Sequence, residues 1–180
     1  MNLPNAISLG RLLAVPITVW LMLDGRWAFA FWLFIAAGVS DAIDGYLARR
    51  LGARTTLGHY LDPLADKALL VAVYVTMAFR DAVPSWLVIM IVSRDLLIVG
   101  GALLLYIAAQ PMQMDPLPIS KLNTVAQIAL AAVVMLERGH GLGTPLVTMA
   151  LTAAVVLTTV LSGAGYIRAW ARGQPGVGSR

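Results

Sequence analysis

The sequence predicts an all-α integral membrane protein with six spanning helices, and two observations carry the prediction. The first is composition: of the 180 residues, 59% are hydrophobic and 12% are charged, and the mean hydropathy is +0.81. These values lie outside the range of a soluble domain of this size. The second observation is that six apolar segments approach the ~20 residues needed to cross a bilayer. No cysteine is present, so disulfides and thiolate metal sites are excluded.

Short polar or Gly/Pro breaks separate the six predicted spans. The spans are residues 10–23, 28–49, 60–79, 84–108, 119–137 and 145–170. Pro16 is expected to kink the first helix without ending it. Residues 1–8 (MNLPNAIS) are expected to form a short N-terminal interfacial segment on the inner membrane face. We therefore predict one membrane-embedded catalytic domain over 1–172 and a disordered, Gly/Pro-rich tail over 173–180.

Basic residues gather at one set of predicted helix ends, which orients the bundle because Lys and Arg accumulate on the cytoplasmic side. This set comprises Arg11, Arg49, Arg50, Arg54, Lys67, Lys121, Arg168, Arg172 and Arg180. The opposite loops hold Arg26, Arg80 and Arg138, which are close in sequence to Asp24, Asp81 and Glu137. Both termini are therefore predicted to be cytoplasmic, and a bacterial inner membrane is the favoured location. Topology explains the net charge of +4, so nucleic acid is not an expected partner.

Four aspartates flank the most basic of these loops. Asp41 and Asp44 are three residues apart, and Asp62 and Asp66 are four apart, so each pair shares one helical face. A charge near the bilayer centre costs ~2.5–3.5 kcal/mol on insertion scales, so these carboxylates need compensation. Two adjacent antiparallel helices would bring all four around one volume. All-carboxylate sites suit magnesium or manganese, and four carboxylates suffice for two ions.

The residues between the pairs favour a bound phosphate ligand. Gly45 and Ala48 lack bulk, so a ligand can approach the helix backbone closely. Arg49 follows them, and its planar fork of donors suits a phosphate held by the metal ions. Gly58, at the start of the third span, leaves similar room.

Residues 41–66 read DAIDGYLARRLGARTTLGHYLDPLAD, which matches D-x2-D-G-x2-A-R-x8-G-x3-D-x3-D at all eight fixed positions. In this signature the chain resembles the CDP-alcohol phosphatidyltransferases. The resemblance implies a six-helix membrane bundle with cytoplasmic termini, usually a homodimer. It also implies transfer of a phosphatidyl group from CDP-diacylglycerol to an alcohol, with release of CMP.

The resemblance assigns a role to each position of the signature. It implies that Asp41, Asp44 and Asp62 bind metal, and that Asp66 is both a metal ligand and the general base for the acceptor hydroxyl. Gly45, Ala48 and Arg49 would contact the nucleotide, Arg49 through the diphosphate, with Gly58 close by. The chemistry is consistent with these roles, because phosphoryl transfer depends mainly on positioning and on neutralising charge around phosphorus.

The acceptor alcohol must be inferred from residues outside the signature. Residues 91–101 (IVSRDLLIVGG) and 119–130 (ISKLNTVAQIAL) resemble the corresponding stretches of cardiolipin synthases of the eukaryotic and alphaproteobacterial type. That likeness implies phosphatidylglycerol as the acceptor. The related phosphatidylglycerophosphate synthases, which use glycerol 3-phosphate, tend to have Arg-Glu in place of Arg94-Asp95. Both acceptors contain a phosphate that Arg94 and Lys121 are suited to bind.

Three alternatives remain open from the sequence. The aspartates of a membrane bundle can form a divalent-cation transport pathway, although transport does not require Gly45, Ala48, Arg49 and Gly58 at those offsets. Arg94 and Asp95 form either a structural salt bridge or part of an acceptor site. Lys121 either marks the inner membrane boundary or binds the acceptor. The small residues at 162–165 are expected to serve helix packing or dimerisation.

Overall fold

The computed structural model describes the backbone of residues 3–51, 56–107 and 118–171, and the side chains of residues 10, 12–40, 67–101 and 118–168. These residues form helices and no strands, as the sequence predicts. The helices are α1 (Leu3–Leu23), α2 (Trp27–Leu51), α3 (Thr56–Phe79), α4 (Ser85–Ile107), α5 (Pro118–His140) and α6 (Pro145–Ala171). The predicted tail at 173–180 lies outside the described residues.

Two helices begin earlier than predicted. Residues 3–8, which we expected to form a separate interfacial segment, are the first turns of α1. Pro4 does not prevent this, because the first turn of a helix does not use its amide hydrogens. α3 begins at Thr56, four residues before the predicted span. The apolar pattern therefore misses first turns in which polar, Gly or Pro residues alternate with apolar ones. Pro16 lies within α1 and does not end it, as predicted.

Left-handed residues end α1 and α3 in the same way. Gly25 has φ +79°, and the next amide, that of Arg26, donates to the carbonyl of Leu21 over 2.8 Å. Asp81 has φ 51°, and the amide of Ala82 donates to the carbonyl of Met77 over 2.8 Å. Both are Schellman motifs, which satisfy carbonyls that the last helical turn leaves without donors.

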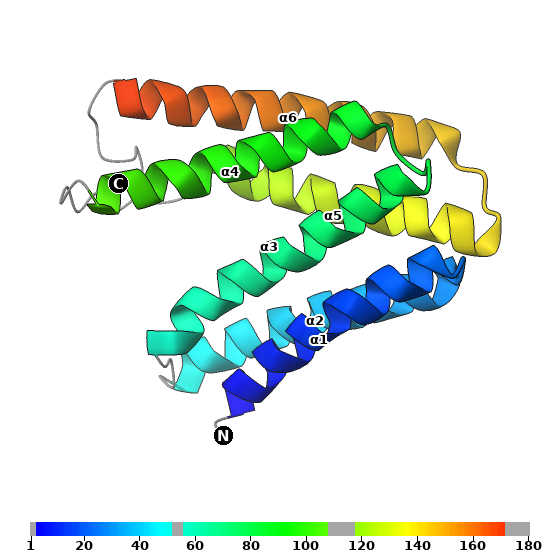
Figure 1. Cartoon of the computed structure of the whole chain (residues 1–180), viewed down its shortest axis with the longest axis horizontal. Coiled ribbons are helices and arrows are strands. Elements are labelled where there is room, and N and C mark those ends of the chain that lie inside the picture. Colours follow the sequence, from blue (N-terminus) through cyan, green and yellow to red (C-terminus); the bar gives the residue numbers. More distant parts are fainter. Residues whose placement is uncertain (1–2, 52–55, 108–117, 172–180) are drawn as a thin grey trace. The chain divides into compact units, whose positions relative to one another are not determined.

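The chain divides into two compact units. Unit 1 comprises Met1–Val83 and Ala131–Gly143, and unit 2 comprises Pro84–Leu130 and Thr144–Arg180. In unit 1, α1 packs against α2 and α3 (Figure 1). In unit 2, α4 packs against α6. The boundary falls within α5, so the first half of this helix belongs to unit 2 and its second half to unit 1.

The core of unit 1 follows helical spacing. Its buried side chains include Ala14, Thr18 and Met22 of α1, Ala30, Phe34 and Ala37 of α2, and Leu70, Val73 and Met77 of α3. Residues three or four apart lie on one face of a helix, so each helix turns a single stripe inward. The hydroxyl of the buried Thr18 has a hydrogen-bond partner, because it donates to the carbonyl of Ala14 over 2.7 Å.

Large apolar side chains also cover the outside of both units. Four of these side chains are 60–65% exposed: Trp32, Ile89, Val125 and Leu157. Apolar side chains with this exposure suit a hydrocarbon environment better than water. Among residues with described side chains, Pro118–His140 and Pro145–Arg168 are long and apolar enough to cross a membrane. Shorter apolar helices cover Leu12–Leu23, Trp27–Ser40 and Lys67–Phe79. Six helices are thus confirmed, while six membrane spans remain a prediction.

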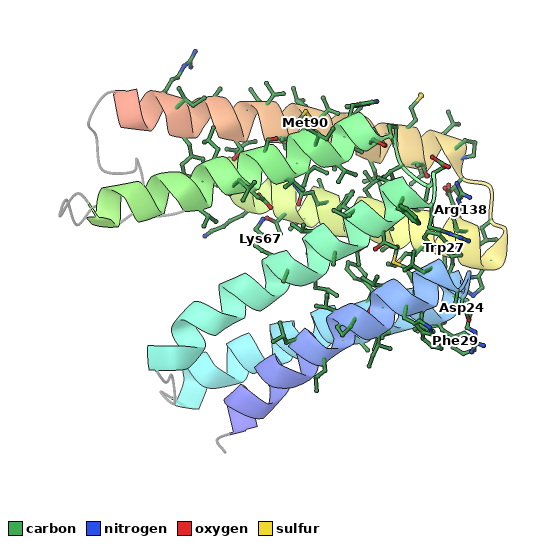
Figure 2. All side chains as sticks on the ribbon, viewed as in Figure 1. Asp24, Trp27, Phe29, Lys67, Met90 and Arg138 are labelled. Carbon is green, nitrogen blue, oxygen red and sulfur yellow. The ribbon has the colours of Figure 1, made fainter. Side chains whose placement is uncertain are left out.

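The three arginines Arg26, Arg80 and Arg138 lie at one end of unit 1, and the membrane side predicted for their loops stays a prediction. Arg138 donates from Nη2 to the backbone carbonyl of Asp81 over 2.6 Å, and a Cβ placed on Gly25 would lie 4.0 Å from Nη2 of Arg80. Arg26 forms an ion pair with Asp24 over 2.7 Å. Figure 2 shows Asp24 and Arg138 at this end of the unit. The loops that end α1 and α3 therefore meet the end of α5.

Candidate active site

The signature aspartates lie on two helices of unit 1, α2 and α3. Asp41 and Asp44 belong to α2, and Asp62 and Asp66 belong to α3, so both pairs have the helical backbone that their spacing requires. Their side chains lie outside the described residues. Lys67, which directly follows Asp66, is the first described side chain of α3 and is labelled in Figure 2.

The register of the described half of α2 predicts where the aspartate positions fall. Its inward stripe consists of Trp27, Ala30, Phe34 and Ala37, with steps of three and four residues. The same steps lead on to positions 41, 44 and 48. On α3, the stripe that contains Val73 and Leu70 leads back to positions 66 and 62 by steps of four. The stripe positions of both helices therefore change from apolar residues to carboxylates at the end of the unit.

A short connection holds the two aspartate-bearing helix ends close to each other. α2 ends at Leu51 and α3 begins at Thr56, and the five Cα–Cα steps between these two residues span at most about 18 Å. The two helices run in opposite directions (Figure 1). The connection is also at the end of the unit away from the loops at Gly25 and Asp81, because α2 starts and α3 finishes at those loops.

The other signature positions share these helices. Gly45, Ala48 and Arg49 lie on α2, and Gly58 lies on α3. Their side chains, like the aspartates, are outside the described residues, so their predicted contacts remain predictions. No cluster of three or more metal-binding side chains occurs among the residues whose side chains the structure describes.

Arg94 of α4 is the best-defined of the predicted site residues. It is 6% exposed and Asp95 is 7% exposed, and Nη1 of Arg94 pairs with Oδ1 of Asp95 over 2.6 Å. Nη2 donates to the hydroxyl of Ser120 on α5 over 2.5 Å and to that of Ser162 on α6 over 2.6 Å. Nε also reaches the Ser162 hydroxyl over 3.2 Å. The guanidinium thus joins the three helices of unit 2.

Lys121, the second predicted acceptor residue, lies in a different environment. It follows Ser120 in the first turn of α5 and its side chain is exposed. Asn123, three residues after Ser120 on the same helix, is fully buried. It accepts hydrogen bonds from the hydroxyls of Thr158 and Thr159, each over 2.9 Å. The structure therefore places Arg94 inside unit 2 and Lys121 on its surface.

Sequence reasoning missed this polar layer. Ser162 was grouped with small residues that serve helix packing, yet its hydroxyl receives two donors of a buried arginine. A signal was present in the spacing of Ser120, Asn123 and Gln127, which are three and four residues apart in an otherwise apolar helix. Polar residues on one helical stripe of a membrane segment usually face other helices.

The family profile of CDP-alcohol phosphatidyltransferases matches residues 1–161 of this chain. The chain belongs to this family. It is 36% identical to "CDP-diacylglycerol--glycerol-3-phosphate 3-phosphatidyltransferase 1, chloroplastic" of Oryza sativa subsp. japonica, over 92% of this chain and 56% of the relative. It is 35% identical to the Bacillus subtilis protein of the same activity name, over 94% of this chain and 95% of the relative.

A second group of relatives has a different name. The chain is 31% identical to "Cardiolipin synthase (CMP-forming)" of Homo sapiens, over 73% of this chain and 49% of the relative. The chain thus spans about half the length of its rice and human relatives. The family is membrane-bound and generally depends on divalent metals. Its substrates are CDP-diacylglycerol and a lipid or glycerol acceptor, so the acceptor is the open question for this chain.

Proposed function

We propose that this protein transfers a phosphatidyl group from CDP-diacylglycerol to phosphatidylglycerol, which yields cardiolipin and CMP. One observation carries the donor half of the reaction: the complete eight-residue signature, divided between two antiparallel helices whose ends are a short connection apart. The acceptor half is supported by the likeness of residues 91–101 and 119–130 to cardiolipin synthases and by the relatives of that name.

The residues of the signature fit divalent cations. Asp41, Asp44, Asp62 and Asp66 offer only carboxylate oxygens, the donors that Mg²⁺ and Mn²⁺ prefer, and no cysteine competes with them. These four aspartates would hold the metal ions, and a fully occupied site would contain two of them. When bound, the ions neutralise the diphosphate and the charge that develops at phosphorus.

The chain's own residues perform the remaining steps. Arg49 binds the diphosphate with its planar fork, and Gly45, Ala48 and Gly58 leave space for the nucleotide. Asp66 takes the proton of the acceptor hydroxyl. The hydroxyl oxygen then forms a bond to the phosphatidyl phosphorus, and the bond from that phosphorus to the CMP oxygen breaks. CMP leaves with the electron pair of that bond, so atoms and charge balance.

Lys121 and Arg94, both in unit 2, are the residues that we propose for binding the acceptor's phosphate. A phosphate group is common to phosphatidylglycerol and glycerol 3-phosphate, and a lysine at the start of α5 is at the right level for a headgroup if α5 spans the membrane. Both termini of the chain and the active site would face the cytoplasm, as the distribution of Lys and Arg predicts. The homodimer implied by the family resemblance is part of this proposal.

A second candidate function is phosphatidylglycerophosphate synthesis, with glycerol 3-phosphate as the acceptor. It is favoured by the relatives of that name, which are 36% and 35% identical over more than nine-tenths of the chain. The two candidates differ only in the acceptor, because both use the same signature and the same donor.

A side-by-side assay separates these candidates. The full chain, purified in detergent with Mg²⁺ or Mn²⁺, receives labelled CDP-diacylglycerol and either phosphatidylglycerol or glycerol 3-phosphate. We expect cardiolipin and CMP with phosphatidylglycerol, and little product with glycerol 3-phosphate. Product with glycerol 3-phosphate alone would reject the cardiolipin proposal in favour of the second candidate. Cation flux in proteoliposomes without release of CMP would reject both.

A further inference from the structure

One buried amide of unit 2 has hydrogen bonds on one side only. Asn123 of α5 is fully buried, and its Oδ1 accepts from the hydroxyls of Thr158 and Thr159 on α6, each over 2.9 Å. Its Nδ2 is buried as well and has no hydrogen-bond partner among the residues that the structure describes. All three residues belong to unit 2. The threonines therefore hold the amide with its Nδ2 directed away from their hydroxyls.

A buried amide nitrogen without a partner is unfavourable. It has lost its hydrogen bonds to water and gained none in exchange, and the large majority of buried side-chain polar atoms in folded proteins do have a partner. Rotation of the amide by 180° would not help, because Oδ1 would then take the place of Nδ2 and lack a donor. In either orientation, one polar atom of Asn123 needs a further hydrogen bond.

Gln127 places a second amide beside this atom. It is four residues after Asn123 on α5, so the two side chains share one face of the helix, and it is also fully buried. The rise between the two residues is about 6 Å along the helix axis. A molecule that forms two hydrogen bonds of ~2.9 Å joins groups up to about 5.8 Å apart. The two amides are therefore close enough for one small molecule to bridge them.

The polar groups at this level of unit 2 match water rather than an ion. They are neutral: the amides of Asn123 and Gln127 and the hydroxyls of Thr158 and Thr159. The charge of Arg94, in the other polar layer of the unit, is balanced by Asp95 over 2.6 Å. Water both donates and accepts, so it suits either atom of each amide, and buried waters typically make about three hydrogen bonds to such groups.

We propose that unit 2 contains one buried water molecule that bridges the side-chain amides of Asn123 and Gln127. The water completes the hydrogen bonding of Asn123, whose Oδ1 links α5 to α6 through the two threonines. It thereby stabilises the contact between these helices. The proposal involves neither substrate nor catalytic metal, so it is independent of the proposed function.

Solid-state nuclear magnetic resonance can detect this water in the full chain in lipid bilayers. The chain contains three asparagines, Asn2, Asn5 and Asn123, so labelling asparagine with ¹⁵N gives three side-chain amide signals. The signal that disappears in Asn123→Leu is that of Asn123. The experiment measures the transfer of magnetisation from water protons to each amide. We expect transfer to the side chain of Asn123, although it is fully buried, and slower transfer to its backbone amide within α5.

Gln127→Met tests the second partner of the water. Methionine has nearly the length of glutamine but no amide, so we expect the transfer to the Asn123 side chain to fall to the level of the backbone amide. Thr124→Val is the matched control. Thr124 is also on α5, and its hydroxyl donates to the carbonyl of Ser120 within the same helix over 3.2 Å. This control should keep the wild-type transfer.

Each outcome decides for or against the bridging water. Transfer that is lost in Gln127→Met and kept in Thr124→Val supports it. Transfer that survives in Gln127→Met overturns it, because the water would then not depend on Gln127. An equal loss in both variants also overturns it, since the cause would be a general change in α5. The wild-type measurement needs no variant of Gln127, and if no water magnetisation reaches the Asn123 side chain there, the proposal is wrong.

Discussion

Replacing Gly139 by alanine tests a close backbone approach in unit 1. A Cβ built on Gly139 would lie 2.6 Å from the backbone nitrogen of Ala28, 2.8 Å from its Cα and 3.0 Å from the carbonyl carbon of Trp27. All three are backbone atoms at the start of α2, so no side-chain rotation relieves the overlap. The end of α5 and the start of α2 would have to separate by about 0.8 Å to restore a normal contact of ~3.4 Å.

The expected magnitude follows from two opposing effects. Overpacking a close contact costs about 1–3 kcal/mol, and a contact with rigid backbone falls in the upper part of that range. Alanine has a better helix propensity than glycine by up to ~1 kcal/mol. We therefore expect Gly139→Ala to lower the free energy of unfolding by about 1–2 kcal/mol. Gly38→Ala is the matched control within the same unit, because no atom lies within 4 Å of its Cβ.

The assay is equilibrium unfolding in mixed micelles with a rising SDS fraction, followed by far-ultraviolet circular dichroism. Gly139→Ala should unfold at a lower SDS fraction than the wild type, and Gly38→Ala at the same or a higher fraction. Arg138→Ala serves as a second reference, since it removes only an exposed hydrogen bond to the carbonyl of Asp81, worth about 1 kcal/mol or less. Equal midpoints for Gly139→Ala and Gly38→Ala would refute the close approach of α5 and α2.

Three further predictions concern the site and the turns. Asp66→Asn should abolish turnover while CDP-diacylglycerol and metal still bind, measured by CMP release and by binding of labelled donor; an active variant would remove the base assignment. A chelator should eliminate activity, and added Mg²⁺ or Mn²⁺ should restore it; activity that survives chelation would contradict the carboxylate site. Asp81→Gly should raise the free energy of unfolding by about 0.5–1 kcal/mol in the SDS assay, because φ of 51° is strained for aspartate but not for glycine; an unchanged midpoint would argue against that strain.

The helices could be predicted from the sequence because apolar run length decides them. The predicted starts of the second, fourth, fifth and sixth spans fall within one residue of the helices at Trp27, Ser85, Pro118 and Pro145. The starts of α1 and α3 were missed because polar, Gly or Pro residues interrupt the apolar runs there, and a helix can form without a continuous apolar run. Hydropathy also could not predict the Schellman motifs that end α1 and α3, because these motifs depend on the positive φ of Gly25 and Asp81.

The donor half of the site could be predicted more fully than the acceptor half. Eight fixed positions within 26 consecutive residues are local information, so the spacing alone places the aspartates on two helix faces. The contacts of Arg94 are not local: its partner Ser162 is 68 residues away. Sequence left both a salt bridge and an acceptor site open for Arg94 and Asp95. The structure confirms the ion pair and adds the two serines, which no spacing in α4 indicates.

The proposed catalytic role of the aspartates can be compared with the structural role of Arg94 through the charges near each in the chain. The charge of Arg94 is balanced within unit 2 by the carboxylate of Asp95, and two serine hydroxyls accept its hydrogen bonds. Residues 41–66 contain four aspartates and three arginines, Arg49, Arg50 and Arg54, and the diphosphate of the donor would add further negative charge. We therefore expect divalent cations to enter the site with the donor, so that metal binding and donor binding each strengthen the other.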